Sequence, residues 1–271
     1  MQLTELGDFL RSRRARLSPV SVGLLVRTTG RRVAGLRREE IALLAGVSVD
    51  YYTRLEQARA ANVSDQVLEA VAGALRLNEF ERRYMFELTR RAAGEEASAV
   101  KVRPALRAMV DAYDSVPAIL HNDCLDVVAI NRMAKILIDD FAAMPPAERN
   151  VVRWMFLDPR ARTVYVDWQE VARQTVAVLR SAAARGAHPD RLDSLVAELV
   201  SSSGEFATYW SEFQVRGDPH GRKRFFHEKV GIITLNYEAL VPPADTGLSL
   251  MVYTADKGSP SEEKLRTLAE P

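Results

Sequence analysis

The sequence predicts a multidomain protein, with an N-terminal all-α bundle of five helices followed by an α+β domain that contains a small antiparallel sheet. Three observations lead to this prediction. The chain has 271 residues, which exceeds one average domain. Apolar residues recur at helical spacing through the first 91 residues. Beyond Pro104, helical segments alternate with short apolar runs that are bounded by turn residues.

Each of the first five helices has its own set of apolar positions at intervals of three or four residues. Residues 18–36, which include Pro19 and three glycines, interrupt this pattern and predict a loop. Ser64 is placed to cap the fourth helix. The apolar sets are Leu6, Phe9 and Leu10; Ile41, Leu44, Ala45 and Val47; Tyr52 and Leu55; Val67, Leu68, Val71 and Leu75; and Phe80, Tyr84, Met85 and Leu88.

A change of composition separates the two domains. Large apolar residues become scarce in 92–103, so we expect a linker there, with domains at 1–91 and 104–271. In the second domain, 118–120 and 125–130 predict a hairpin with a polar break at 121–123. Helices are expected within 131–142, 168–184 and 190–202. Strands are expected at 225–227, 231–237 and 248–253.

The composition is that of a globular protein, with 47% hydrophobic and 27% charged residues. A single cysteine, Cys124, excludes an internal disulfide framework and a cysteine-rich zinc site, and its apolar neighbours predict a buried, inert thiol. The first residues are too charged for a signal peptide, and no apolar run approaches the roughly 18 residues of a membrane span. We therefore expect a cytoplasmic protein that does not enter the membrane.

Arginine is concentrated near the N-terminus, although the net charge of the chain is only +1. The segment 11–38 contains nine arginines and no acidic residue; they are Arg11, Arg13, Arg14, Arg16, Arg27, Arg31, Arg32, Arg37 and Arg38. Such a cluster is a candidate phosphate-binding surface. The alternative is a solvated, mobile arm without a specific partner, and charge alone does not decide between them.

Residues 38–57 match the requirements of a helix-turn-helix. This motif needs a small residue where two helices cross, a glycine in the turn and apolar residues on the inner faces, and Ala42 and Gly46 meet the first two needs. Ser48 is placed to cap the second helix, so that Val49, Asp50, Thr53 and Arg54 point outward. An ordinary helical hairpin with glycine in its turn is the alternative, but it does not account for the arginines upstream.

This segment resembles the helix-turn-helix of the lambda-repressor/Cro type, called the XRE family. The resemblance implies that Val49, Asp50 and Arg54 read base edges, with Ser48 near the DNA backbone and Arg37 and Arg38 on phosphates. Asp50 has a second interpretation, as a carboxylate that the N-terminal end of the helix dipole stabilises. Glu56 is interpreted as the partner of a basic residue, and Tyr51 and Glu39 as structural.

A longer resemblance covers nearly the whole chain. The segments LGDFLRSRRARLSP, GLRREEIALLAGVSVDYYTRLEQAR, VVAINRMAKIL, RNVVRWMFLDP and FFHEKVGIITLNYEAL are similar to MmyB-like transcriptional regulators. The resemblance implies a PAS-like second domain that binds a small apolar ligand, and a fatty acid is associated with the pocket in that family. It implies double-stranded DNA as a partner and no cofactor, apart from a fatty acid as a possible bound ligand.

The ligand site is predicted from residue types, because an acyl chain needs apolar walls and a cationic or hydrogen-bonding group at the mouth. The candidates are Trp154, Phe156, Trp168 and Trp210 as walls and Arg153, Arg173, Arg180 and His227 as partners of a carboxylate. The alternatives are that the aromatic residues form ordinary core, and that Arg173 and Arg180 pair with Asp167, Glu170 or Glu198. Asn131 is interpreted as a helix cap rather than a ligand-binding residue.

No enzyme or metal site is predicted. The chain lacks the Gly-x-Ser-x-Gly elbow and a phosphate-binding glycine loop, and its four histidines have no metal-ligand spacing. Two functions remain: a DNA-binding regulator that senses an apolar ligand, or one whose C-terminal domain serves only dimerisation or binding of a protein partner. A homodimer is expected in both cases, because one recognition helix covers only half of a DNA site.

Overall fold

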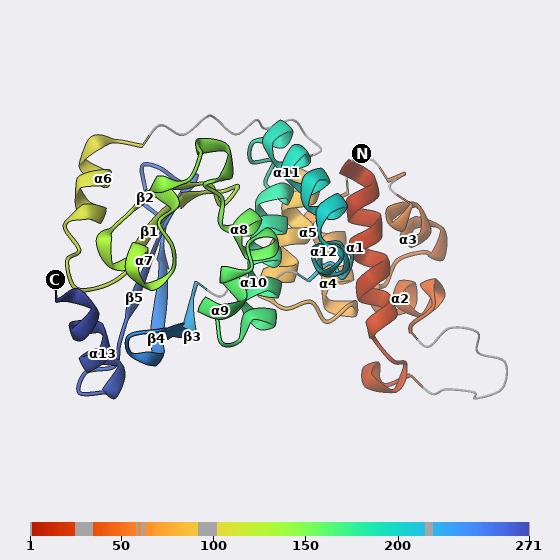
Figure 1. Cartoon of the computed structure of the whole chain (residues 1–271). Coiled ribbons are helices and arrows are strands. Elements are labelled where there is room, and N and C mark those ends of the chain that lie inside the picture. The colour runs from red at the N-terminus through yellow and green to blue at the C-terminus, as the bar shows by residue number, and fades with distance from the viewer. Residues whose placement is uncertain are drawn as a thin grey trace. The chain divides into compact units, whose positions relative to one another are not determined.

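The computed structural model describes residues 2–24, 35–57, 59–60, 63–91, 102–214 and 219–270. The chain divides into two compact units, residues 1–96 and 97–271, which are described separately below (Figure 1). The first is helical and the second is α+β, so the predicted fold class is confirmed. Most of the predicted linker 92–103 lies outside the described residues, and its exact limits stay a prediction.

The first unit contains the five predicted helices. Phe9 of the first helix packs edge-on against Tyr84 of the last, with ring centroids 5.0 Å apart, and this contact closes the bundle. Buried side chains from every helix, among them Leu10, Ile41, Leu55 and Val71, fill the space between. The helices are α1 (Gln2–Arg16), α2 (Arg38–Ala45), α3 (Val49–Glu56), α4 (Asp65–Ala74) and α5 (Glu79–Arg91).

Two details of this unit differ from the prediction. The expected loop 18–36 contains a short 3₁₀ turn, η1 (Val20–Val22), while residues 25–34 lie outside the described part. Leu44, assigned to an inner face, is 37% exposed, because Ile41, Ala42 and Ala45 already cover the inner side of α2.

The second unit is built on one antiparallel sheet with the strand order β2-β1-β5-β4-β3. The strands are β1 (Ala118–Asn122), β2 (Val127–Ile130), β3 (His220–His227), β4 (Gly231–Leu240) and β5 (Leu248–Thr254). In Figure 1 the sheet joins segments from the two ends of the domain, because β1 pairs with β5.

Helices surround the sheet and complete the α+β domain. One sheet face carries Ile119, Phe225, Ile233 and Tyr253, and it contributes to the main core. Leu106 and Val110 of α6 join the smaller core on the other face. The helices are α6 (Pro104–Asp111), α7 (Arg132–Leu137), α8 (Val151–Leu157), α9 (Arg160–Val164), α10 (Trp168–Ala184), α11 (Pro189–Ser202), α12 (Gly204–Ser211) and α13 (Pro260–Ala269), with 3₁₀ turns η2 (Phe141–Ala143) and η3 (Pro146–Glu148).

The predicted segments of this unit are found with altered limits. The hairpin is present, but His121, expected in the polar break, belongs to β1 and faces Val127 after a shift of register. The helix expected in 131–142 is the shorter α7, and Asn131 caps it by accepting a hydrogen bond from the Ala134 amide at 2.9 Å, as predicted. Strand β3 begins at His220 and is longer than the predicted 225–227.

Candidate DNA-binding and ligand-binding sites

The turn between α2 and α3 has the local structure that its sequence predicts. Gly46 adopts φ +66°, a left-handed conformation that glycine takes without strain, and its amide returns to the carbonyl groups of Ala42 and Leu43. The Ser48 hydroxyl accepts a hydrogen bond from the Tyr51 amide at 3.1 Å and caps α3. These two residues fix where the recognition helix starts.

The outward face of α3 carries the predicted base-reading residues. Val49, Asp50 and Arg54 are exposed, and Thr53 is partly exposed. In the described part of the chain, no ion pair or side-chain hydrogen bond engages Arg54 or Asp50. Tyr52 and Leu55, on the opposite side, are buried in the bundle. The helix therefore presents a polar surface with an available guanidinium group.

The buried carboxylate of Glu56, at the end of α3, binds several arginines. Arg14 donates to it from Nε at 2.9 Å and Nη2 at 3.0 Å, and Arg38 from Nε at 3.1 Å and Nη2 at 2.8 Å. Arg11 lies 3.7 Å away. Burial would raise the pKa of Glu56, but the hydrogen bonds from Arg14 and Arg38 outweigh it and the pKa lies below its usual value. Glu56 is thus the basic-residue partner that the sequence predicted, and it links α1, α2 and α3.

The arginine cluster is less free than its composition indicated, which is a correction. Its acidic partners come from outside the segment 11–38: packing of the bundle brings in Glu56 and Glu81, whereas Asp8 and Glu39 are near neighbours in the sequence. Arg13 pairs with Glu81 at 3.0 Å, Arg11 with Asp8 at 3.0 Å and Arg37 with Glu39 at 3.3 Å. Arg27, Arg31 and Arg32 lie outside the described residues.

Three of the four predicted aromatic wall residues lie in one group formed by α8, α10 and α12. Phe156 packs edge-on against Trp168 at 5.7 Å and Phe206 at 5.2 Å, measured between ring centroids. Trp210 stacks on Phe206 at 5.7 Å. Trp154 lies apart from these contacts, against Phe141.

These rings are tightly packed, and the indole nitrogens of Trp154 and Trp168 are hydrogen-bonded. The Trp154 Nε1 donates to Asp139 at 2.7 Å, and the Trp168 Nε1 donates to the Met155 carbonyl at 3.1 Å. All four wall candidates except Trp210 are less than 10% exposed. The arrangement has the character of core, the alternative that the sequence left open.

The predicted cationic partners of a ligand have partners within the protein. Arg153 pairs with Glu198 at 2.8 Å, and Arg173 lies 4.0 Å from Glu212 and over the Tyr209 ring. Arg180 is buried beside Trp210, whose carbonyl it bonds, and Phe213. Asp167, a suggested partner of Arg173 or Arg180, instead binds Arg224.

The remaining candidate, His227, is at the end of β3. Its Nδ1 accepts a hydrogen bond from the Lys229 amide at 3.1 Å, which stabilises the turn into β4. This contact gives the ring a structural role in the hairpin.

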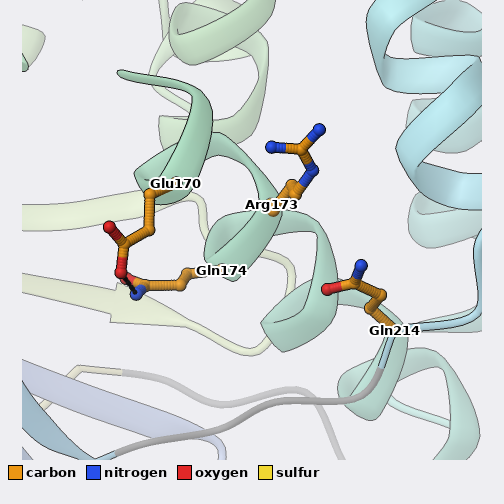
Figure 2. A pocket seen from close by; sticks show the side chains of 4 residues that line it. All are labelled: Glu170, Arg173, Gln174 and Gln214. Carbon is orange, nitrogen blue, oxygen red and sulfur yellow. Dashed lines mark hydrogen bonds between the residues drawn. The ribbon is translucent and has the colours of Figure 1, made fainter. Parts of the chain in front are cut away.

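One hollow opens to solvent beside α10. It contains about 370 Å³ of space, part of it open solvent, and Glu170, Arg173, Gln174 and Gln214 line it (Figure 2). Glu170 and Gln174 are joined by a hydrogen bond of 3.2 Å. The lining is polar, so this hollow lacks the apolar walls that an acyl chain requires. Of the predicted ligand residues, Arg173 lines it.

The sequence did not single out Lys223 among the candidate residues, although the structure gives it an unusual environment. Its ammonium group lies 4.5 Å from the centroid of the Tyr237 ring. Lys223 stands between Arg222 and Arg224 in the sequence. Which of these three cations faces the core depends on the alternation of side chains along the strand, and the sequence alone did not define that alternation.

Within the described residues, no group of three or more His, Cys, Asp and Glu side chains is arranged to hold a metal ion. No described helix is both long enough and apolar enough to cross a membrane. Cys124 is buried, as predicted, and burial raises the pKa of its thiol to about 12.

A helix-turn-helix with an exposed recognition helix, joined to a separate α+β domain, defines a two-domain DNA-binding protein. Comparison with family models agrees. Residues 5–85 match the model described as a helix-turn-helix domain, and residues 102–268 match the MmyB-like transcription regulator ligand binding domain. Comparison with curated proteins gives no match.

The chain belongs to the family of MmyB-like transcription regulators, as its sequence motifs predicted. It is a DNA-binding transcription regulator with a ligand-binding C-terminal domain. Both matched families are regulator domains rather than enzymes.

Proposed function

We propose that this regulator reads specific DNA sequences as a cytoplasmic homodimer, and that a fatty acid bound in its C-terminal domain alters its affinity for DNA. In this proposal α3 enters the major groove. Arg54, with Val49, Asp50 and Thr53, faces the base edges, while Arg37, Arg38 and Ser48 lie near the phosphates.

The DNA-binding part of the proposal rests on the exposed and available side chain of Arg54. It is exposed on the outward face of α3, and no partner in the described residues holds it. A guanidinium presented in this way can donate two hydrogen bonds to the O6 and N7 atoms of guanine. Asp50, one turn earlier, can accept from a cytosine amino group or remain a helix-end carboxylate.

The test of this part uses a DNA site selected by the wild-type protein from random sequences. Arg54→Ala is expected to lose about 1–3 kcal/mol of binding to the selected site and to relax specificity at one base pair. The matched control is Arg83→Ala, which removes an exposed arginine from α5, a helix other than the recognition helix. Equal losses on selected and random DNA for Arg54→Ala would refute the base-reading role.

Replacement of Arg37 or Arg38 is expected to affect DNA binding differently from replacement of Arg54. Loss of a phosphate contact weakens binding to all sequences alike and lowers the slope of log K against log salt concentration by roughly one. The Arg37→Ala variant tests this more directly, because Arg38 also binds the buried Glu56. An unchanged salt slope for Arg37→Ala contradicts the assignment.

Dimerisation is supported by the geometry of DNA, since two recognition helices about 34 Å apart are needed to read both half-sites on one face. We expect the dimer surface to lie largely in residues 104–271. Light scattering at micromolar concentration, with and without a palindromic site, measures this. A monomer under both conditions contradicts the proposal.

The fatty acid is supported by the family resemblance and by the aromatic and aliphatic side chains of the C-terminal domain. Burial of an acyl chain gains about 0.8 kcal/mol per CH₂ group, so affinity is expected to rise with chain length.

Delipidated protein is titrated with fatty acids of increasing length, and melting temperature and DNA affinity are both followed. A thermal shift without change in DNA affinity would leave the lipid without a regulatory role, because a ligand shifts an equilibrium only by its differential affinity for two states. Absence of any shift would favour a domain used for dimerisation or partner binding.

A further inference from the structure

Lys223 lies on the face of the sheet that contributes to the main core. In β3, the side chains of Lys223 and Phe225 point to the same face, and Phe225 is completely buried. Leu235, the neighbour of Lys223 on β4, is also completely buried. Lys223 itself is partly buried. A cationic side chain therefore extends over an apolar surface while remaining within reach of solvent.

The contacts of the Lys223 ammonium group are aromatic. Its Nζ lies 4.5 Å from the centroid of the Tyr237 ring and 5.9 Å from that of Tyr253, and both tyrosines are buried. Among the described residues, no carboxylate pairs with Lys223. Burial lowers the pKa of Lys223 to about 8. At neutral pH most of the ammonium still carries its charge.

The adjacent arginines of the same strand show the contrast. Arg222 pairs with Asp256 at 2.9 Å, and Arg224 pairs with Asp167. Both point to the opposite face of the sheet, where they are exposed. The two outer cations of β3 thus have carboxylate partners, whereas no carboxylate among the described residues pairs with the cation on the inner face.

The local charge is that of a single cation. His121 on β1 is also buried, and burial, together with the smaller effect of the Lys223 charge, lowers its pKa, so that its ring is neutral at pH 7. Asp123, the carboxylate whose charge acts on the pKa of His121, pairs with Arg185 at 2.5 Å. One positive charge beside buried apolar side chains would complement a ligand that has one negative charge and an apolar body.

We infer that Lys223 binds the carboxylate of the ligand, with the rings of Tyr237 and Tyr253 holding its ammonium group in position. This inference rests on the proposed function, since it assigns the head group of the same apolar ligand. It replaces Arg153, Arg173 and Arg180 in that role, because those arginines already have partners within the protein.

The experiment compares dodecanoate with methyl dodecanoate, which has the same chain but no charge. Both are titrated into delipidated full-length wild type, Lys223→Met and the control Lys257→Met, which removes an exposed lysine. A charged hydrogen bond is worth enough to change affinity by about 10- to 100-fold. We expect Lys223→Met to lose this factor for dodecanoate and to bind the ester within about threefold of wild type. Lys257→Met is expected to behave as wild type with both ligands.

The stability of the ligand-free variants gives a second measurement. Lys223→Met removes the two ring contacts but leaves no described carboxylate without its partner, so the variant is expected to melt close to the temperature of wild type. A large fall in melting temperature would indicate that the ammonium pairs with a protein carboxylate, and this would overturn the inference.

The outcomes separate this inference from the proposed function. If wild type and Lys223→Met bind dodecanoate and its ester equally well, the acyl ligand stands and the role of Lys223 is overturned. If wild type binds neither compound, the acyl ligand and the head-group assignment both fail. If the carboxylate preference depends on Lys223 but DNA affinity does not respond, the inference holds and the regulatory part of the proposed function fails.

Discussion

Replacement of Glu56 by glutamine is expected to destabilise the N-terminal domain without affecting the C-terminal one. The carboxylate is 1% exposed and receives hydrogen bonds from Arg14 and Arg38. Glutamine has nearly the same shape but no charge, so the substitution removes the electrostatic partner of both arginines without leaving a large cavity.

The size of the loss in unfolding free energy depends on how well each arginine can be hydrated again once the carboxylate is removed. Breaking a buried ion pair by removal of one partner costs about 3–5 kcal/mol. The side chains of Arg38 and Arg11 are 42% and 54% exposed, and they can be solvated again, but that of Arg14 is only 14% exposed. We therefore expect Glu56→Gln to lose about 3 kcal/mol, at the lower end of this range.

Urea unfolding of the full chain can assign this loss to one domain. The three tryptophans, Trp154, Trp168 and Trp210, all lie in residues 97–271, so their fluorescence follows the second unit. Far-UV circular dichroism follows both units. We expect the variant to shift the dichroism transition of the first unit to lower urea, with the fluorescence transition unchanged.

The control is Glu69→Gln, which breaks an exposed pair with Arg82 in the same domain. Exposed pairs contribute about 0–1 kcal/mol, so this variant is expected to unfold almost as wild type. A loss for Glu56→Gln no larger than that of the control would refute the reasoning. A shift of both transitions by the same amount would refute its restriction to one domain.

The effect of Glu56→Gln has a defined pH dependence. The pKa of Glu56 in the folded protein lies below its ordinary value of 4.5. Its stabilising contribution is therefore complete above pH 4.5 and is lost as the pH falls through the folded pKa. The difference between wild type and Glu56→Gln should be largest near neutral pH and should decrease below pH 4.5.

Three further substitutions or modifications have expected outcomes. Gly46→Ala places a side chain at φ +66° with no atom within 4 Å of the added carbon. Conformational strain alone should therefore lower the unfolding free energy of the first unit, measured by circular dichroism, by about 1–2 kcal/mol. Asn131→Ala leaves the buried Ala118 and Ala134 amides without their acceptor. It should lower the unfolding free energy of the second unit, measured by tryptophan fluorescence, by about 3 kcal/mol or more. Cys124 should react with a thiol reagent at neutral pH only after unfolding in urea, because it is buried and its pKa is about 12; rapid reaction of the folded protein contradicts this.

Local features of the fold could be predicted because they depend on residues close in sequence. A cap needs only a side-chain acceptor and an amide three residues later, and Ser48, Ser64 and Asn131 supply it as predicted. The turn glycine, Gly46, follows from the same local geometry. These residues define the start of the recognition helix, of α4 and of α7.

Long-range partners could not be assigned from the sequence. Arg14 and Glu56 are 42 residues apart, and Arg13 meets Glu81 only because α1 packs against α5. The arginines therefore appeared uncompensated in the sequence. For Phe156 and Trp168 the residue types are equally suitable for a pocket wall and for core, and only the packing distinguishes the two.

The cluster around Glu56 reconciles the predicted phosphate contact of Arg38 with its observed ion pair. Arg38 donates to Glu56 from Nε and Nη2, so its Nη1 can still donate to another acceptor. Its side chain is 42% exposed, which leaves this group accessible. Arg14 also neutralises Glu56, so the cluster keeps a net positive charge even with every ion pair formed. A phosphate can therefore bind Arg38 without breaking the contacts that hold α2 and α3 together, and the same arginine can stabilise the helix-turn-helix and contribute to DNA affinity.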